Sequence, residues 1–143
     1  MSHFFGWLLA VIVTFFFLQI SAESIFIYID IVTIVFLFGT VYGLSLVIFG
    51  GSKTLQSIIH IKSLFTSGDT ANKVLSNIYL TQIKLAIIAS LIGFSAGLMM
   101  VFANYELADS NSIGPQFAIL MPLFLYSSII IGLIYYPLYK KLA

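Results

Sequence analysis

Cysteine and arginine are both missing from this chain of 143 residues, and only 8% of its residues are charged. The lack of cysteine excludes disulfide bonds, thiolate catalysis and metal sites that are ligated by cysteine. The lack of arginine removes the side chain best suited to bidentate contact with phosphate. Because the formal net charge is only +1, nothing in the charge balance favours nucleic acid as a partner.

Side chains that carry enzyme chemistry are also scarce. The only histidines are His3 and His60, and no carboxylate lies at ligand spacing from His60. A metal site needs several suitable ligands, and acid–base catalysis needs groups of matched pKa within hydrogen-bond reach. The sequence offers no Ser/His/Asp set, carboxylate pair or Gly-Lys-Ser phosphate loop. We therefore expect no enzyme activity, no cofactor and no metal ion.

Hydrophobic residues are what the chain does have, at 61% of the total. Soluble domains are about 25% charged, so this composition indicates a membrane protein. Four apolar spans approach the roughly 20 residues that cross a bilayer, namely residues 4–20, 25–49, 78–103 and 116–137. The first could instead be a signal peptide cleaved after Ala22, but no basic segment precedes it, so we expect a retained helix. The predicted fold is an all-α integral membrane protein with four transmembrane helices in one domain.

The lysines predict the orientation. They lie between the second span and the continuous apolar part of the third, residues 85–102, and after the fourth span: Lys53, Lys62, Lys73, Lys84, Lys140 and Lys141. The charged residues of the other two connections are all acidic, among them Glu23 and Asp109. Because an excess of lysine marks the cytoplasmic side, both termini are predicted to be cytoplasmic.

The segment of residues 51–77 is predicted to be a short cytoplasmic connection. Gly50 and Gly51 end the second span, and Leu55, Ile58 and Ile59 then recur at helical spacing, as in an amphipathic helix at a membrane surface. From Ala71 a helical pattern runs without proline or glycine into the third span. We expect the third helix to be one long rod.

Small residues recur at spacings of three and four in the second and third spans. They are Gly39 and Gly43, and then Ala86, Ala89, Gly93 and Gly97. Such residues let the backbones of neighbouring membrane helices approach closely. We expect the second group to pack between the subunits of a cyclic oligomer.

The fourth span carries an ordered set of marker residues. It has a Gly-Pro pair at its entrance, an Ala-Ile pair, a central Leu-Tyr pair, a late proline and a final Lys-Leu pair: Gly114, Pro115, Ala118, Ile119, Leu125, Tyr126, Pro137, Lys141 and Leu142. In this register the span resembles the final transmembrane helix of the MotA/TolQ/ExbB proton-channel family. The Asp30-x-x-Thr33 and Gly39-Thr40-x-x-Gly43 patterns resemble the second helix of its four-helix MotA branch. The large cytoplasmic domain of that branch is missing, so the resemblance is to a reduced MotA.

The resemblance implies a pentameric ring in the bacterial inner membrane, built around two helices of a MotB/ExbD/TolR-type partner. In the family that single-span partner supplies the proton-binding aspartate, and without it we expect a closed lumen, filled by lipid. Pro115 then has a structural role in the first helical turn, and Pro137 marks a kink or belongs to the family motif. The alternative is a structural membrane scaffold of similar fold that does not conduct.

Residues for an ion path are few. Leu123 and Phe124 occupy the positions of the family's adjacent threonines, where they would form a hydrophobic constriction in the lumen. The remaining hydroxyls at depth either line the path or bond their own preceding backbone: Ser90, Ser95, Ser127 and Ser128. We expect Asp30 about one turn inside the outer boundary, either as a helix-start residue or as a contact on the ion path.

Overall fold

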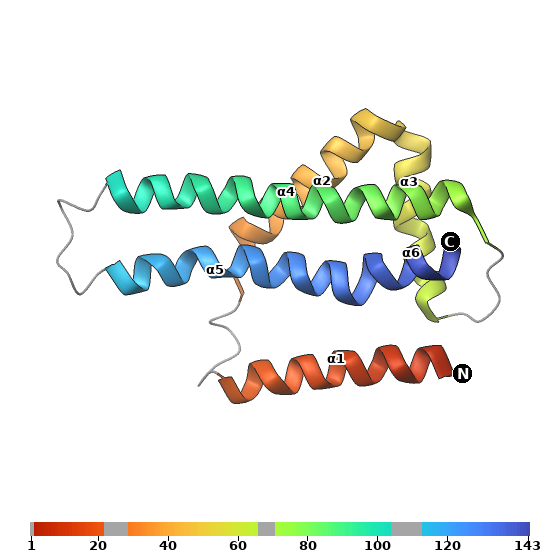
Figure 1. Ribbon diagram of the computed structural model, residues 1–143, viewed down its shortest axis with the longest axis horizontal. Helices are drawn as coiled ribbons and strands as arrows, with labels where there is room; N and C mark the ends of the chain where they lie inside the picture. The colour runs from red at the N-terminus through yellow and green to blue at the C-terminus, as the bar shows by residue number, and fades with distance from the viewer. Residues whose placement is uncertain (1, 22–28, 66–70, 104–112) are drawn as a thin grey trace.

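The computed structural model describes residues 2–21, 29–65, 71–103 and 113–143, and every regular element within them is helical. Along the chain these are α1 (Ser2–Ser21), α2 (Ile31–Phe49), α3 (Gly51–Ile59), the 3₁₀ helix η2 (His60–Phe65), α4 (Lys73–Ala103), α5 (Ile113–Ile130), the π-helical turn η5 (Ile131–Tyr135) and α6 (Tyr136–Leu142). The last three follow one another without a break and form a single long rod (Figure 1).

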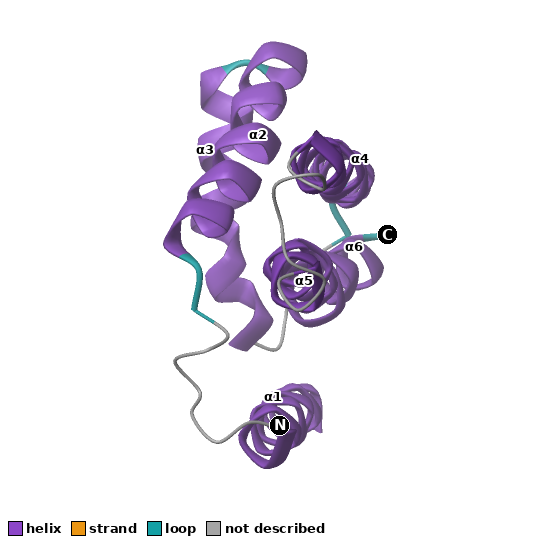
Figure 2. Cartoon of the chain, turned by 90° about the vertical axis from the view of Figure 1, so that its left-hand side faces the viewer, coloured by secondary structure: helices purple, strands orange, loops and turns teal. Residues whose placement is uncertain are grey.

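Two long antiparallel rods form the centre of the bundle. One is α4, and the other is α5 with its continuation through η5 and α6 (Figure 1). Helix α1 lies beside the second rod on the side away from α4, and α2 and α3 cover a third side (Figure 2). The start of α1 and the end of α6 lie at the same end of the bundle (Figure 1).

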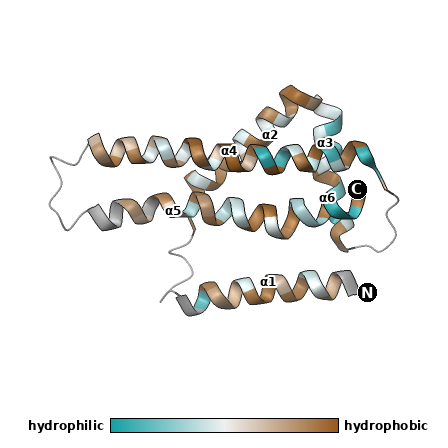
Figure 3. Cartoon of the chain, viewed as in Figure 1, coloured by the Kyte–Doolittle hydropathy of each residue, from teal (hydrophilic) through white to brown (hydrophobic). Residues whose placement is uncertain are grey.

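Helix α4 is the uninterrupted rod that the sequence predicts. Its 31 residues measure about 46 Å, whereas the hydrocarbon core of a bilayer is about 30 Å thick. Asn72 caps its first turn, because its side-chain oxygen accepts the amide of Leu75 at 3.1 Å. The most polar part of the rod is its beginning (Figure 3), which includes the buried Gln82 and the exposed Lys84.

Three described helical stretches are long and apolar enough to cross a membrane: Ile31–Phe49, Lys73–Ala103 and Leu120–Leu142. The apolar part of α1, Phe4–Gln19, is shorter. In the most apolar part of each of these three stretches, only 22%, 28% and 28% of the residues, respectively, are buried within the chain. Most of this apolar surface faces outward, which suits lipid or further subunits rather than water.

Helix α2 begins later than expected. The sequence predicts a span from residue 25, but Ile29 and Asp30 precede the helix and residues 25–28 lie outside the described part. At its other end Gly50 has φ +79°, a left-handed backbone that favours glycine, and its amide donates to the Leu46 carbonyl at 2.9 Å. Gly50 therefore ends α2 and turns the chain into α3, as the glycine pair predicts.

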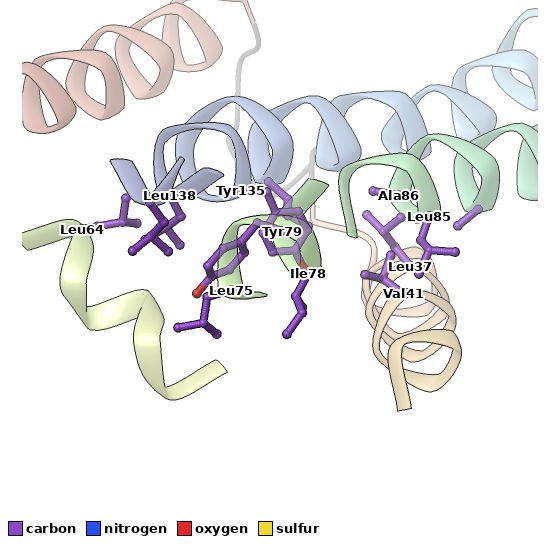
Figure 4. Close-up of a cluster of buried hydrophobic side chains, with 13 residues drawn as sticks. Leu37, Val41, Leu64, Leu75, Ile78, Tyr79, Leu85, Ala86, Tyr135 and Leu138 are labelled. Atoms are coloured by element: carbon purple, nitrogen blue, oxygen red, sulfur yellow. The ribbon is translucent and has the colours of Figure 1, made fainter. Parts of the chain in front are cut away.

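The buried core has two neighbouring parts. Figure 4 shows Leu37 and Val41 of α2 against Leu85 and Ala86 of α4, and all four side chains are at most 8% exposed. Lipid is as apolar as these side chains, so within a bilayer this contact is stabilised by close packing rather than by escape from water.

The second part of the core joins α4 to the end of the other rod. Tyr79 and Tyr135 lie with ring centroids 6.2 Å apart, and Leu138 beside them is fully buried (Figure 4). The Asn72 amide also donates to the Leu142 carbonyl at 3.0 Å. The start of α4 and the end of α6 are thereby fixed to each other.

Candidate functional site between α2 and α5

Asp30 forms the N-cap of α2, as one of the two sequence interpretations predicts. Its carboxylate accepts the backbone amides of Val32 at 3.0 Å and Thr33 at 3.4 Å, and also the hydroxyl of Thr33. These bonds satisfy helix-start amides that have no partner within the helix, and the helix dipole favours a negative charge at this end.

The cap is attached to α5 about one turn before this helix continues into η5. The Asp30 amide donates to the Tyr126 hydroxyl oxygen at 2.6 Å. Tyr126 lies ten residues after Gln116 and eleven before Pro137, so about 15 Å of helix separates it from either end of the fourth predicted span. The Asp30 backbone therefore contacts a residue near the middle of the fourth predicted span. Because Asp30 also precedes the first residue of α2, a helix long enough to cross a membrane, its expected position about one turn inside the outer boundary stays a prediction.

The Asp30–Thr33–Tyr126 cluster places a carboxylate and two hydroxyl groups where α2 meets α5. Thr33 is buried at 9% exposure, and Asp30 is half-buried. A charge in hydrocarbon costs on the order of 3 kcal/mol or more, so such a group needs the amide and hydroxyl donors that surround Asp30 here. Chemically, the cluster can hold a negative charge or accept a proton where α2 meets α5.

Two of the four candidate serines are bonded to backbone carbonyls. The Ser90 hydroxyl contacts the carbonyl oxygens of Ala86 at 2.8 Å and Leu123 at 3.4 Å, and Ser127 donates to the Phe124 carbonyl at 3.1 Å. Both side chains are at most 5% exposed. Their hydroxyls thus stabilise the α4–α5 contact and the α5 backbone.

The other two serines, Ser95 and Ser128, are exposed on this chain. They are therefore the hydroxyls that a lumen or a neighbouring subunit could reach directly.

The expected hydrophobic constriction and the stripe of small residues meet inside the chain. A Cβ atom added to Gly93 would lie 2.7 Å from Leu123 Cδ1, and one added to Gly97 would lie 2.2 Å from Leu120 Cδ2. Leu123 is 7% exposed, which removes it from the surfaces that a lumen could use. Phe124 packs against Phe94, with ring centroids 4.9 Å apart.

The expected intersubunit position of the stripe is corrected accordingly. Ala86 and Ala89 are 0% exposed within the single chain, and the two glycines of the stripe receive leucines of α5. In α2 the reverse holds, because Gly39 and Gly43 are exposed and no atom lies within 4 Å of a Cβ built on either. The small residues of α4 serve packing within the chain, and those of α2 are left uncovered by it.

The two marker prolines occupy different helical settings. Pro115 lies in the first turn of α5, where its missing amide has no helical partner to satisfy. Pro137 follows the π-helical turn η5, in which the amide of Tyr136 reaches back five residues to the Ile131 carbonyl. Pro137 thus comes directly after a local widening of the helix.

A second polar cluster holds α3 against α4. The Tyr79 hydroxyl donates to the Ser57 carbonyl at 2.7 Å, and the Gln82 amide nitrogen donates to Ser57 Oγ at 3.0 Å. Gln82 is fully buried, and its Oε1 has no hydrogen-bond partner among the described residues. Among all residues that the structure describes, no three histidine, aspartate or glutamate side chains lie close enough together to hold a metal ion.

No protein-family model, curated protein or solved structure matches this chain. The interpretation of the site therefore rests on its own residues. Sequence reasoning identified Asp30 but missed its attachment to Tyr126, because no local pattern relates two residues 96 positions apart. The Asp30-x-x-Thr33 spacing, which is typical of a capped helix start, was the available signal for Thr33.

Proposed function

We propose that this chain is a ring-forming membrane subunit of a complex driven by an ion-motive force, similar to the proton channels and stators of the MotA/TolQ/ExbB family. In this proposal four helices cross the bacterial inner membrane with both termini in the cytoplasm, and five copies surround the helices of a single-span partner. The marker residues of the fourth span and the lysine distribution support it.

One observation carries the proposal, namely the Asp30–Thr33–Tyr126 cluster where the start of α2 meets α5. An ionisable side chain between membrane helices is costly and is retained mainly where ions or protons pass. The partner would supply a second carboxylate in the lumen, and Asp30 with Tyr126 would form the polar contact that this chain contributes.

The alternative, a non-conducting scaffold, has its own support. Ser90 and Ser127 bond backbone carbonyls, and Leu123 is buried between helices, so few polar groups are left for a water-filled path. In this interpretation Asp30 only starts α2, and Tyr126 only anchors that start to α5.

Purification from native membranes through a tag on this chain distinguishes the two functions at the level of assembly. The channel proposal expects a particle of five copies together with a single-span chain that carries one membrane aspartate. Native mass spectrometry that finds a monomer in mild detergent contradicts the ring, and a ring without a second chain favours the scaffold.

Proton flux tests the role of the cluster. The purified complex is placed in liposomes with a pH-sensitive dye and an imposed potential, and Asp30→Asn is compared with the original chain. Asparagine caps helices as well as aspartate does, so the fold is kept while the charge is lost. We expect flux from the complex, none from this chain alone, and at least a tenfold decrease in Asp30→Asn. Unchanged flux in Asp30→Asn would show that Asp30 acts only as a helix cap. Ser52→Ala on α3 is the control, because this exposed serine lies outside the candidate site.

A further inference from the structure

A groove separates α1 from the end of the second rod. Its volume is about 520 Å³, within the range of about 300–1,000 Å³ that is typical of ligand sites. Gly6, Trp7 and Ala10 of α1 form one wall, and Gly132 and Leu133 of η5 form the other. The groove exists because glycine and alanine face each other across it, so the two helices do not fill the space between them.

The groove runs along the helices for about the depth of one lipid leaflet. Lys141 at its mouth and Gly132 at its inner end are nine residues apart, which corresponds to about 14 Å of helix. One leaflet contributes about 15 Å of a hydrocarbon core that is about 30 Å thick. The apolar walls therefore match an acyl chain in length.

The mouth of the groove is basic. Lys140 and Lys141 both line it, and the Lys140 ammonium lies 5.6 Å from the centroid of the Tyr139 ring. By sequence, residues 50–84 and 136–143 together contain six lysines and one acidic residue, Asp69, which lies outside the described part. A negatively charged head group meets complementary charge at this end of the groove and apolar walls beyond it.

We propose that the groove binds one anionic phospholipid of the lysine-bearing leaflet, with an acyl chain between α1 and η5 and the phosphate at Lys140 and Lys141. Basic pockets between transmembrane helices on the cytoplasmic side bind anionic lipid head groups by this combination of contacts. The lipid fills the space between α1 and the bundle and so fixes α1 in place. The proposal holds equally for a channel and for a scaffold.

Native mass spectrometry with defined lipids tests the head-group contact. Delipidated protein in mild detergent is titrated with phosphatidylglycerol and, separately, with phosphatidylcholine of the same acyl chains. We expect preferential retention of phosphatidylglycerol, and in Lys140→Gln/Lys141→Gln a loss of affinity of about fivefold for each lysine. Lys53→Gln/Lys84→Gln is the matched control, because it removes the same charge from exposed lysines of α3 and α4.

A filled groove tests the acyl-chain contact. A Cβ atom built on Gly132 has no atom within 4 Å, so Gly132→Leu occupies the groove without a clash at that position. We expect it to abolish lipid retention, whereas Gly39→Leu on the exposed face of α2 retains the lipid. Both variants are first shown to elute like the original protein.

Any one of four results would overturn the proposal. One is equal retention of the two lipids by the original protein, and a second is an equal loss in the Lys53/Lys84 control. The third is that a second copy of the chain, and not a lipid, occupies the groove. In that case the protein would be a dimer, and Gly132→Leu would dissociate it both with and without lipid. Added inorganic phosphate separates a headgroup site from an anion site: if phosphate alone binds as tightly as the lipid, the acyl-chain contact is refuted.

Discussion

The indole N–H of Trp7 donates to the carbonyl oxygen of Leu133 at 2.7 Å. In a regular α-helix this carbonyl would accept the amide of residue 137, but Pro137 has no amide hydrogen. The proline thus frees an acceptor in the fourth span, and a side chain from the first helix uses it. Trp7 also packs edge-on against Phe65, with ring centroids 4.8 Å apart, so it joins α1 to both η2 and η5.

Trp7→Phe should weaken the attachment of α1. The ring contact with Phe65 is kept, but the Leu133 carbonyl loses its indole donor, and we expect a stability loss of about 1 kcal/mol in detergent. Pro137→Ala supplies a backbone amide for the same carbonyl. In a double-mutant cycle followed by thermal unfolding, Trp7→Phe should therefore cost less in the Pro137→Ala background. Equal costs in both backgrounds would mean that the two residues do not share this acceptor.

Gly97→Leu should destabilise the single chain rather than an oligomer. Its Cβ would lie 2.2 Å from Leu120 Cδ2, and overpacking of a tight contact costs about 1–3 kcal/mol. Gly39→Leu makes the same change where no atom is near, and it gains the same helix propensity. The difference in stability between the two variants therefore measures the cost of overpacking at Gly97. Thermal unfolding in detergent measures both. If Gly97→Leu unfolds at the original temperature but no longer assembles with other subunits, the stripe of small residues on α4 lies at a subunit interface after all.

Local features of the fold could be predicted from the sequence. The Gly50 break, the Asp30 cap and the long α4 rod each depend on residues within a few positions, through φ preferences, capping and the absence of proline and glycine. The neighbour of each helix could not be predicted in this way. A stripe of small residues favours close approach but does not determine whether the approaching helix belongs to the same chain, so Gly93 and Gly97 were assigned to a subunit interface.

The candidate site was found only in part for the same reason. An aspartate before an apolar span is visible in the sequence, but its neighbour on α5 is not. Phe36 lies close to Gly93 and the Asp30 amide donates to Tyr126, and both contacts join segments that are distant in the sequence. The groove beside Gly132 likewise depends on how α1 lies against η5.

Tyr126→Phe should loosen the start of α2. The ring stays in place while the Asp30 amide loses its acceptor, and we expect a loss of about 1 kcal/mol. Tyr136→Phe is the matched control, because that side chain is 51% exposed on α6. Hydrogen exchange of the first turn of α2 reports the change locally, and it should accelerate in Tyr126→Phe alone. Identical exchange in both variants would argue against an anchoring role for the Tyr126 hydroxyl.

Topology can be tested directly because the chain contains no cysteine. Single cysteines at Ser24, Ser52 and Ser110 are treated on whole cells with an impermeant thiol reagent. The lysine distribution predicts labelling at Ser24 and Ser110, which lie in the two acidic connections outside the described residues, and no labelling at Ser52 on α3. The opposite labelling pattern would show that the chain has the inverted orientation, with the basic mouth of the groove on the outer side of the membrane.

Gln82→Met tests whether the buried amide of α4 has an unseen partner. In the described chain Gln82 gains one bond, from its nitrogen to Ser57 Oγ, while its buried Oε1 remains unsatisfied. An unsatisfied buried acceptor costs about 1–3 kcal/mol, and one neutral hydrogen bond contributes about 1 kcal/mol, so the flexible, apolar methionine should leave stability unchanged or raise it slightly. Ser57 keeps its bond to the Thr54 carbonyl at 2.7 Å, which limits any loss on that side. Thermal unfolding of the purified protein measures the balance. A loss of more than about 2 kcal/mol would show that Oε1 accepts a hydrogen bond from bound water or from another subunit. A glutamine side chain stabilises the fold by that amount only when both its nitrogen and its oxygen have hydrogen-bond partners.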